Sequence, residues 1–303
     1  MRLVADIGGT NARVALCAKG VIDDTSIERY SNADWDSLDD LLRAYRGAQR
    51  GAGIDEMVIA VAGPVHAGRA RLTNRNWTIN ADAMKQDFAC KRVVLLNDLG
   101  ALGHAVPVFG ADHVTQVCGG DLPREPDGQA LVVGIGTGFN ISQVICKDGA
   151  TVCPPAEAGH VSMPSAILAE LVEHGCNPAL FPTIETLFSG RGLTAFCRAV
   201  TGAGRLTGEM AVQAYATDGA PNTKAAIDLY ARLLGLLLRE FSLSYMPTQG
   251  IFLAGSVARA IVGCASDPLV TVLKMPCRFR ADSTPALYVI EQDGAALLGS
   301  ARY

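Results

Sequence analysis

Residues 3 to 16 read Leu-Val-Ala-Asp-Ile-Gly-Gly-Thr-Asn-Ala-Arg-Val-Ala-Leu, an apolar run that one acid and a glycine pair interrupt. This pattern predicts a strand, a tight turn and a second strand, which together form a β-hairpin. The glycine pair permits positive φ and lets backbone N–H groups approach an anion, while Thr10 and Asn11 add side-chain donors. The turn is therefore a candidate phosphate site with the Asp6 carboxylate at its mouth.

The turn matches neither of two common nucleotide-binding loops. A P-loop ends in Gly-Lys-Ser/Thr, and a dinucleotide fingerprint has three spaced glycines that open a helix. A glycine pair that only joins two strands is the plainer interpretation. Asp6 argues against it, because an acid at the end of a buried apolar strand is costly unless something pairs with it.

A second stretch resembles the first. Residues 131 to 145 read Leu-Val-Val-Gly-Ile-Gly-Thr-Gly-Phe-Asn-Ile-Ser-Gln-Val-Ile, and the leading Leu-Val, the isoleucine and the first turn glycine coincide with residues 3 to 15. The two halves of the chain therefore contain similar segments. Two such hairpins predict two related lobes, each offering a turn to one polyphosphate.

Composition excludes several classes of protein. A chain of 303 residues with 49% hydrophobic and 18% charged residues is long and apolar enough for two globular domains. A net charge of −4 without a Lys/Arg cluster gives no nucleic-acid footprint. No leader pattern begins the chain, and charges interrupt its most apolar helical stretch, so we expect neither secretion nor a membrane span.

The cysteines and histidines do not form a recognisable metal site. Nine cysteines are scattered without a C-x-x-C pair, which is typical of reduced thiols in the cytoplasm. Five histidines show no H-x-x-x-H spacing. We therefore expect no structural zinc.

Polar side chains follow an apolar run at residues 93–96, which predicts a buried strand. Asn97 and Asp98 come next, before a helical stretch over residues 99–106. Because ligands bind at the carboxyl ends of strands in α/β sheets, this pair is a candidate site. Either residue could instead cap the helix, and both interpretations hold if one caps while the other faces a cleft.

Three further segments are weaker candidates. Glu157 and His160 lie in a loop bounded by proline and glycine, where they could share a pocket or be solvated. Glu185 is another acid near a turn. Gly255 and Ser256 end a strand and open a helix over residues 257–264, which suits close approach to a nucleoside or a turn with no ligand.

Taken in order, these segments resemble the bacterial ATP-dependent glucokinases. The matching segments are Asp6 to Arg13, Leu96 to Asp98, Gly136 to Gly138, Glu157 to His160, Glu185 with Ser189-Gly190, and Phe252 to Gly255. The resemblance spans nearly the whole chain. It implies the two-lobed actin-like ATPase fold, which is ribonuclease H-like, with a cleft between a small and a large α/β domain. We expect the small domain at 1–107, with the closing helix 294–303 packed on it, and the large domain at 108–293.

The resemblance also implies roles for individual residues. Asp98 resembles the general base that accepts the proton of the sugar 6-hydroxyl, and Asp6 resembles the acid that holds Mg²⁺ through water. The residues that resemble readers of the other sugar hydroxyls are Asn97, Glu157, His160 and Glu185. Those that resemble contacts to ATP are Gly8, Gly9, Thr10 and Asn11 at the β- and γ-phosphates, Gly136, Thr137 and Gly138 in a second phosphate loop, and Gly255 with Ser256 at the adenosine.

The chain departs from the family at three places. The usual Gly-Thr-Gly-Leu-Gly ends here in Phe139-Asn140, Glu-Gly-Gly-His has become Glu157-Ala158-Gly159-His160, and Ala-Gly-Gly ends in Ser256. Asparagine tolerates positive φ, so Asn140 could preserve the turn, or it could narrow the phosphate site and weaken ATP binding. The cysteine cluster of zinc-containing relatives is absent after His160, which favours the metal-free branch.

The expected activity is transfer of the ATP γ-phosphate to the 6-hydroxyl of glucose, in a cytoplasmic homodimer with Mg²⁺. A kinase for another hexose would use the same hydroxyl readers. A sugar sensor that has lost turnover is a second alternative, motivated by Asn140 and Ser256. A chaperone-like ATPase of the same fold would not need five polar residues around a sugar.

Overall fold

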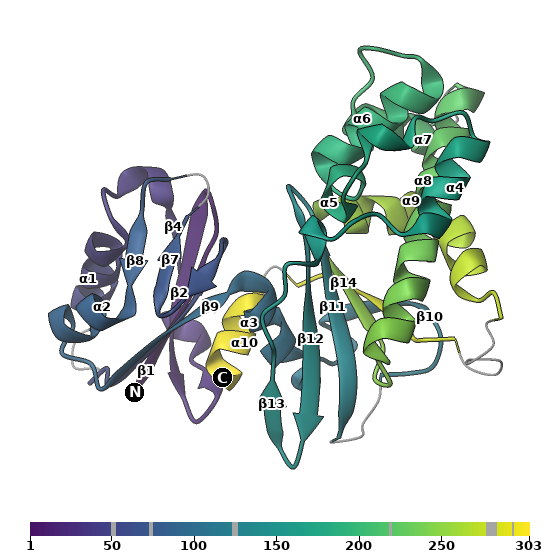
Figure 1. The fold of residues 1–303 in the computed structure, drawn as a ribbon. Helices are drawn as coiled ribbons and strands as arrows, with labels where there is room; N and C mark the ends of the chain where they lie inside the picture. The colour runs from purple at the N-terminus through teal and green to yellow at the C-terminus, as the bar shows by residue number, and fades with distance from the viewer. Residues whose placement is uncertain (50–52, 73–74, 123–126, 218–219, 277–283, 293) are drawn as a thin grey trace. The chain divides into compact units, whose positions relative to one another are not determined.

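The computed structural model describes residues 1–49, 53–72, 75–122, 127–217, 220–276, 284–292 and 294–303 (Figure 1). The chain divides into two compact units. Unit 1 comprises Met1–Phe109, Thr151–Cys153 and Gln292–Tyr303, and unit 2 comprises Gly110–Ala150 and Pro154–Glu291. Each unit is built around its own mixed β-sheet.

The sheet of unit 1 has the order β3-β2-β1-β5-β9, with β4 paired to β2. β1 is antiparallel to β2 and parallel to β5, which is parallel to β9. These strands span Arg2–Ile7 (β1), Asn11–Ala18 (β2), Val21–Ile22 (β3), Glu28–Ser31 (β4), Glu56–Val61 (β5) and Arg92–Asn97 (β9). A small sheet holds Val65–His66 (β6), Arg69–Arg71 (β7) and Thr78–Asn80 (β8).

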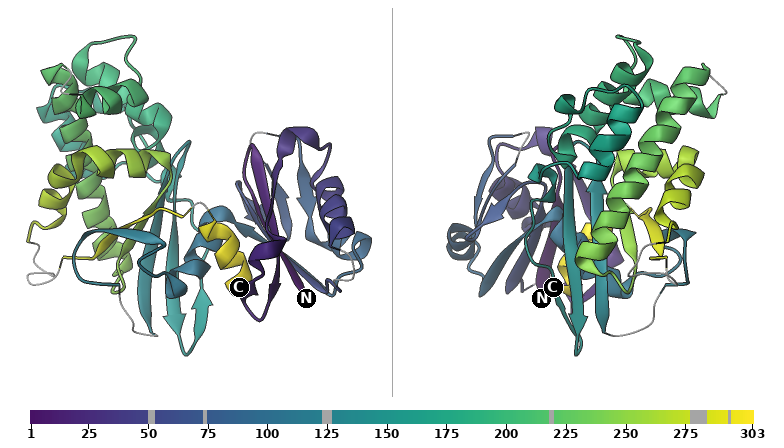
Figure 2. Two further views of the ribbon diagram at one scale, coloured as in Figure 1. Left: turned by 180° about the vertical axis from the view of Figure 1, so that it is seen from behind. Right: turned by 45° about the vertical axis from the view of Figure 1, so that its right-hand side comes forward.

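Side chains of β1 alternate between two apolar layers, as the pleat of a strand requires. Ile7 belongs to the cluster that contains Leu41 of α1, whereas Val4 belongs to the cluster that contains Leu297 of α10. Figure 2 shows α10, in yellow, against this sheet. Asp6 shares the face of Val4. The helices of unit 1 are Leu38–Ala48 (α1), Ala81–Asp87 (α2), Asp98–Ala105 (α3) and Ala295–Arg302 (α10).

The sheet of unit 2 has the order β10-β15-β14-β11-β12-β13. β11 is antiparallel to β12 and parallel to β14, which is parallel to β15. The strands span Val114–Cys118 (β10), Gly128–Ile135 (β11), Phe139–Lys147 (β12), Ala150–Val152 (β13), Ile251–Ala254 (β14) and Leu287–Ile290 (β15). Both predicted hairpins are thus confirmed.

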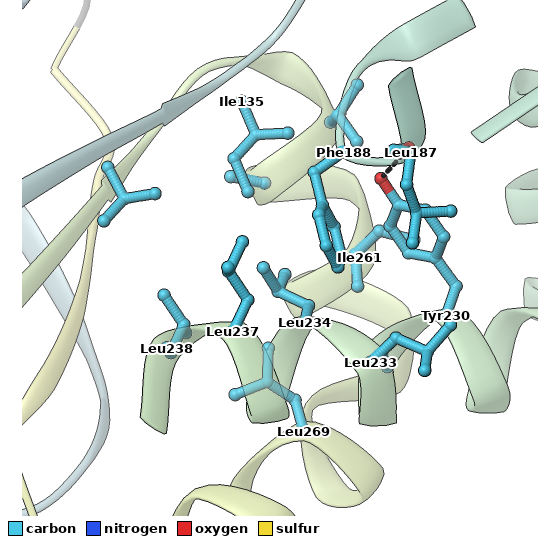
Figure 3. Close-up of a cluster of buried hydrophobic side chains, with 14 of the residues drawn as sticks. Ile135, Leu187, Phe188, Tyr230, Leu233, Leu234, Leu237, Leu238, Ile261 and Leu269 are labelled. Carbon is cyan, nitrogen blue, oxygen red and sulfur yellow. Dashed lines mark hydrogen bonds between the residues drawn. The ribbon is translucent and has the colours of Figure 1, made fainter. Parts of the chain in front are cut away.

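The helices of unit 2 pack around an apolar core that includes Ile135 of β11. The helices are Ser165–Glu173 (α4), Ile184–Leu187 (α5), Gly190–Thr201 (α6), Gly208–Ala216 (α7), Pro221–Tyr245 (α8) and Ser256–Leu273 (α9). Figure 3 shows Leu233, Leu234 and Leu237 of α8 packed in the core with Ile261 of α9. The hydroxyl of the fully buried Tyr230 donates to the Leu187 carbonyl oxygen at 3.3 Å, which satisfies the polar end of this side chain.

Two sequence predictions of local structure are wrong. The apolar run before Asn97 predicts a buried strand, but β9 pairs only with β5 among the described strands and is half-buried at the edge of the sheet. A separate prediction, that the helix after β14 ends at Cys264, is also wrong. It continues to Leu273 through a kink at Ala265, where φ is −134° and ψ is 43°. Asn140, for which the sequence left two alternatives open, is extended in β12, where it pairs with Gly134.

One described helix, α9, is long and apolar enough to span a membrane by length and composition. The same helix contributes Val257, Ile261 and Leu269 to the core of unit 2. A buried core helix satisfies the same test, so this observation is weak evidence for a span.

Candidate active site

The first glycine turn joins β1 to β2 and is held from one side by a buried asparagine. Gly8 N–H donates to the Asn11 carbonyl oxygen at 2.9 Å. Asn32 is fully buried. Its Nδ2 donates to the Gly8 carbonyl oxygen at 2.8 Å, and its backbone N–H donates to the Thr10 carbonyl oxygen at 2.8 Å. Thr10 and Asn11 stay exposed, so the turn keeps donors for a ligand.

Sequence reasoning missed Asn32, which lies 24 residues from Gly8 and carries no recognisable pattern. It begins a 3₁₀ turn, Asn32–Asp34, directly after β4. Its Oδ1 has no hydrogen-bond partner although it is buried. A buried polar atom without a partner needs an explanation. Here the explanation is that Asn32 donates two hydrogen bonds to the turn, at the carbonyl oxygens of Gly8 and Thr10.

Asp6 is the last residue but one of β1, and its carboxyl group is in an unusual environment. Burial, followed by the nearby Asp98 carboxylate, raises the pKa of Asp6 to about 6, while Arg13 opposes the shift. Arg13 is the cross-strand partner of Asp6 on β2. Because this environment disfavours the ionised form of Asp6, a cation that approaches the carboxylate would stabilise that form.

Asn97 and Asp98 lie at the junction of β9 and α3. Asn97 caps the helix, since its Oδ1 accepts from Leu99 N–H at 3.0 Å and its Nδ2 donates to the Gly63 carbonyl oxygen at 3.0 Å. The prediction that one member of the pair caps the helix is confirmed. Asp98 Oδ1 accepts from the same Leu99 N–H at 2.9 Å. Burial raises the pKa of Asp98, and hydrogen bonds partly offset the increase.

The second glycine turn, between β11 and β12, lies where two helices of unit 2 begin. Gly136 N–H donates to the Gly138 carbonyl oxygen at 3.0 Å, and Gly190 N–H at the start of α6 donates to the Gly136 carbonyl oxygen at 2.8 Å. A Cβ on Gly136 would lie 4.0 Å from the Ser256 nitrogen, at the start of α9. Helix amino termini carry partial positive charge, which suits an anion.

Gly255 must be glycine for a local steric reason. Its φ is +95°, and a Cβ there would lie 2.3 Å from the Ile135 carbonyl oxygen. No side chain caps α9. The N–H groups of its first turn therefore have no capping side chain as an acceptor. Ser256 is exposed at the first position of this helix.

Glu185 braces the second turn. Its Oε2 accepts from Phe139 N–H at 3.0 Å, and a Cβ on Gly138 would lie 2.7 Å from the same oxygen. Arg191 approaches the other oxygen at 3.5 Å, but the arginine is 79% exposed, so this ion pair adds little.

Glu157 precedes a 3₁₀ turn, Ala158–His160, His160 is the last residue of that turn, and both side chains are exposed. A Cβ on the intervening Gly159 would lie 2.3 Å from the Phe139 carbonyl oxygen and 3.3 Å from the Glu185 Cβ. The loop therefore packs directly on the start of β12, beside Glu185.

The predicted site residues fall into two sets. Unit 1 holds Asp6, Gly8, Gly9, Thr10, Asn11, Asn97 and Asp98, and unit 2 holds Gly136, Thr137, Gly138, Glu157, His160, Glu185, Gly255 and Ser256. Within unit 1, the Asp98 carboxylate is close enough to Asp6 to raise the pKa of Asp6. Within unit 2, the second turn, Glu185 and the Glu157 loop are in mutual contact.

The two mixed sheets, each with a glycine hairpin turn, have the topology of the two-lobed actin-like ATPase fold. A solved glucokinase from an Antarctic psychrotroph is similar, with a TM-score of 0.82 and 24% identity over 99% of this chain and 97% of that one. A solved glucokinase of the ROK family from Streptomyces griseus, in complex with glucose and AMPPNP, matches with a TM-score of 0.63 and 20% identity over 99% and 97%. These two show the fold.

The sequence comparisons identify the family. The family model for glucokinase matches residues 3–303. The glucokinase of Saccharophagus degradans is 32% identical over 273 residues, which cover 84% of this chain and 82% of that protein. The chain therefore belongs to the glucokinase family, and it is an ATP-dependent hexose kinase.

Proposed function

We propose that the chain transfers the γ-phosphate of ATP to the 6-hydroxyl of glucose, with Asp98 as general base. The observation that carries this proposal is the environment of Asp98. Its carboxyl group is half-buried at the first residue of α3, near a second carboxylate and in the same unit as a glycine turn. A raised pKa makes a carboxylate a stronger base near neutral pH.

Asp98 would act mainly by orienting the hydroxyl group of the substrate. The hydrogen bond from Leu99 N–H holds Asp98 Oδ1, which leaves Oδ2 for the hydroxyl proton of a substrate. Asn97 anchors the same junction to Gly63, so the base is held by packed elements. In phosphoryl transfer, positioning of the nucleophile and neutralisation of charge supply most of the rate.

We propose that ATP binds to the glycine turns and helix termini of both units. Gly8, Gly9, Thr10 and Asn11 would contact the β- and γ-phosphates, and Gly136, Thr137 and Gly138 would form the second phosphate loop. Gly255 and Ser256 would contact the adenosine, where the positive φ of Gly255 permits close approach. The Streptomyces griseus structure with AMPPNP supports the use of a nucleotide in this fold.

The Asp6 carboxylate fits Mg²⁺, and we propose that it holds the ion through water. Among the described residues, no group of three or more His, Cys, Asp or Glu side chains could hold a metal. Mg²⁺ commonly uses one or two carboxylates together with waters and substrate phosphates, so this donor set is sufficient. When bound, the ion would neutralise charge on the transferring phosphate.

We propose that the other sugar hydroxyls are bound by four residues, Asn97, Glu157, His160 and Glu185. Polar groups that a bound sugar buries and leaves unpaired cost about 1–3 kcal/mol each, which lets such residues discriminate between hexoses. The contact between the Glu157 loop and Glu185 supports a shared role for these acids. The glucose complex of the Streptomyces griseus enzyme supports glucose as the substrate.

The proposal is tested by coupled ADP release over a panel of glucose, fructose, mannose and glucosamine. We expect the highest kcat/KM with glucose, and phosphorus NMR of the product should identify the 6-phosphate. A higher kcat/KM for another hexose would reassign the substrate. Calorimetric glucose binding without ADP formation would support the sensor instead.

We also propose a cytoplasmic location and a homodimer, which rest on the family resemblance. None of the eight cysteines within the described segments forms a disulfide, which is usual for proteins of a reducing compartment, and Cys277 lies outside those segments. We propose that residues 1–107 and the closing helix 294–303 form the small domain, and that residues 108–293 form the large domain. Light scattering on the purified chain would test the assembly.

A further inference from the structure

Asn140, the second residue of β12, makes contacts that the proposed reaction does not account for. Its Nδ2 donates to the Ala156 carbonyl oxygen at 2.7 Å and to Glu157 Oε2 at 3.2 Å. Its Oδ1 accepts from Ala158 N–H at 3.0 Å and from Ile141 N–H at 2.8 Å. One side chain thus binds three consecutive residues of the Glu157 loop.

The strand fixes the position of this asparagine. Phe139 and Ile141 are buried in the core, so Asn140 points to the opposite face of β12. Its backbone pairs with Gly134 in a regular ladder. The amide is therefore presented from a rigid element to an exposed loop.

Glu157 needs such a partner to be useful as a sugar ligand. An exposed glutamate has several rotatable bonds, and ordering it on binding costs conformational entropy. The Asn140 amide occupies Oε2 and leaves Oε1 as an acceptor for a hydroxyl group. A glycine at position 140 could make none of these side-chain bonds.

We infer that Asn140 is a positioning residue that orients Glu157 toward the sugar and sets sugar affinity. This inference rests on the proposed role of Glu157 in sugar binding. Asn140 does not belong to the phosphate turn, whose hydrogen bonds are made by Gly136, Gly138 and Glu185. Its replacement should therefore change the KM for glucose and leave the KM for ATP unchanged.

Two variants test the inference with steady-state kinetics and calorimetry of glucose binding. Asn140→Ala should raise the KM for glucose about tenfold, with kcat and the KM for ATP within about twofold. Asn140→Asp keeps the acceptor for Ala158 and Ile141 but places a carboxylate beside Glu157. It should raise the KM for glucose further, because like charges repel.

A double-mutant cycle tests whether Asn140 acts through Glu157. If it does, adding Asn140→Ala to Glu157→Ala, which removes the acceptor of Asn140 Nδ2, should change glucose affinity by less than about twofold. Asn177→Ala is the matched control, since Asn177 Oδ1 accepts from Ala179 N–H in the same unit. This control should leave both KM values unchanged.

The outcomes separate the inference from the proposed function. An active wild-type enzyme with an unchanged glucose KM in both variants, an equal rise in both KM values, or additive effects in the cycle would overturn the inference alone. Failure of the wild-type chain to phosphorylate glucose would overturn the proposed function. If Asn140→Ala does not fold, Asn140→Asp carries the test because it retains the structural acceptor.

Discussion

The hairpin β1–β2 in unit 1 and the hairpin β11–β12 in unit 2 have equivalent neighbours in the same order. Each first strand pairs antiparallel with the second strand and parallel with a later one, β5 or β14. When the two turns are aligned by their first glycines, Gly8 and Gly136, Asp6 corresponds to Gly134. The registers agree, because these residues lie opposite Ala60 and Ala254.

The difference between the two hairpins is chemical. Unit 1 places two carboxyl groups, Asp6 and Asp98, near each other, and both have raised pKa values. In unit 2 the counterpart of Asp6 has no side chain, and two helix amino termini border the turn. A repeated topology can therefore carry unlike chemistry, with two carboxyl groups close together in one unit and two helix amino termini beside the turn in the other.

The largest expected effect is in unit 1, on catalysis. Asp98→Asn should lower kcat by about 10²–10⁴-fold and leave glucose affinity within about tenfold, because a general base acts on the reaction more than on binding. Steady-state kinetics and calorimetry measure the two quantities. Asp82→Asn, at an exposed first-turn acid of α2, is the control. Unchanged turnover would reject Asp98 as the base.

The second effect is in unit 2, on stability. Gly255→Ala places a Cβ 2.3 Å from a carbonyl oxygen at φ +95°, so the free energy of unfolding should fall by about 2–4 kcal/mol. Gly136→Ala is the matched control, because its Cβ would have no neighbour closer than 4.0 Å and the change should be smaller. Denaturant unfolding measures both. Equal losses in the two variants would contradict the steric argument.

A third prediction concerns the charge that distinguishes Asp6 from Gly134. The folded chain holds the Asp6 proton more tightly than the unfolded chain, since the pKa is raised from 3.8 to about 6. Its contribution to stability is present at low pH and is lost as the pH rises through 6. Asp6→Asn should therefore raise the free energy of unfolding at pH 7 by about 1–3 kcal/mol, and by less at pH 5.

Denaturant unfolding at both pH values measures this difference, with Asp82→Asn as the control. A gain that is the same at pH 5 and pH 7 would contradict the assigned charge state. The same variant should also weaken the dependence of activity on Mg²⁺ if Asp6 holds the ion.

The smallest effect is expected at the asparagine that holds the first turn. Asn32→Ala removes the bond to the Gly8 carbonyl oxygen, and the KM for ATP should rise about threefold to tenfold while glucose affinity stays within about twofold. Asn80→Ala removes the cap of α2 at a similar cost in stability and serves as control. A KM for ATP that rises equally in both variants would indicate a general loss of stability.

Sequence reasoning predicted elements well where the signal was local. The apolar runs and glycine turns predicted both hairpins, and the position before α3 predicted its cap. It could not predict that β9 lies at the edge, because strand order depends on how helices pack on the sheet. It also could not decide the role of Asn140, because the partners of this side chain lie 16 to 18 residues away.

The sequence by itself determined the two hairpins, the acid Asp6 near the end of β1 and the family, because each depends on the order of neighbouring residues. Only the tertiary structure decided that Asn32 holds Gly8 and that Glu185 braces Phe139, across 24 and 46 residues. Backbone preference and burial leave periodic signals along a chain. Hydrogen bonds between remote segments leave none, since they form only when packing has brought those segments together.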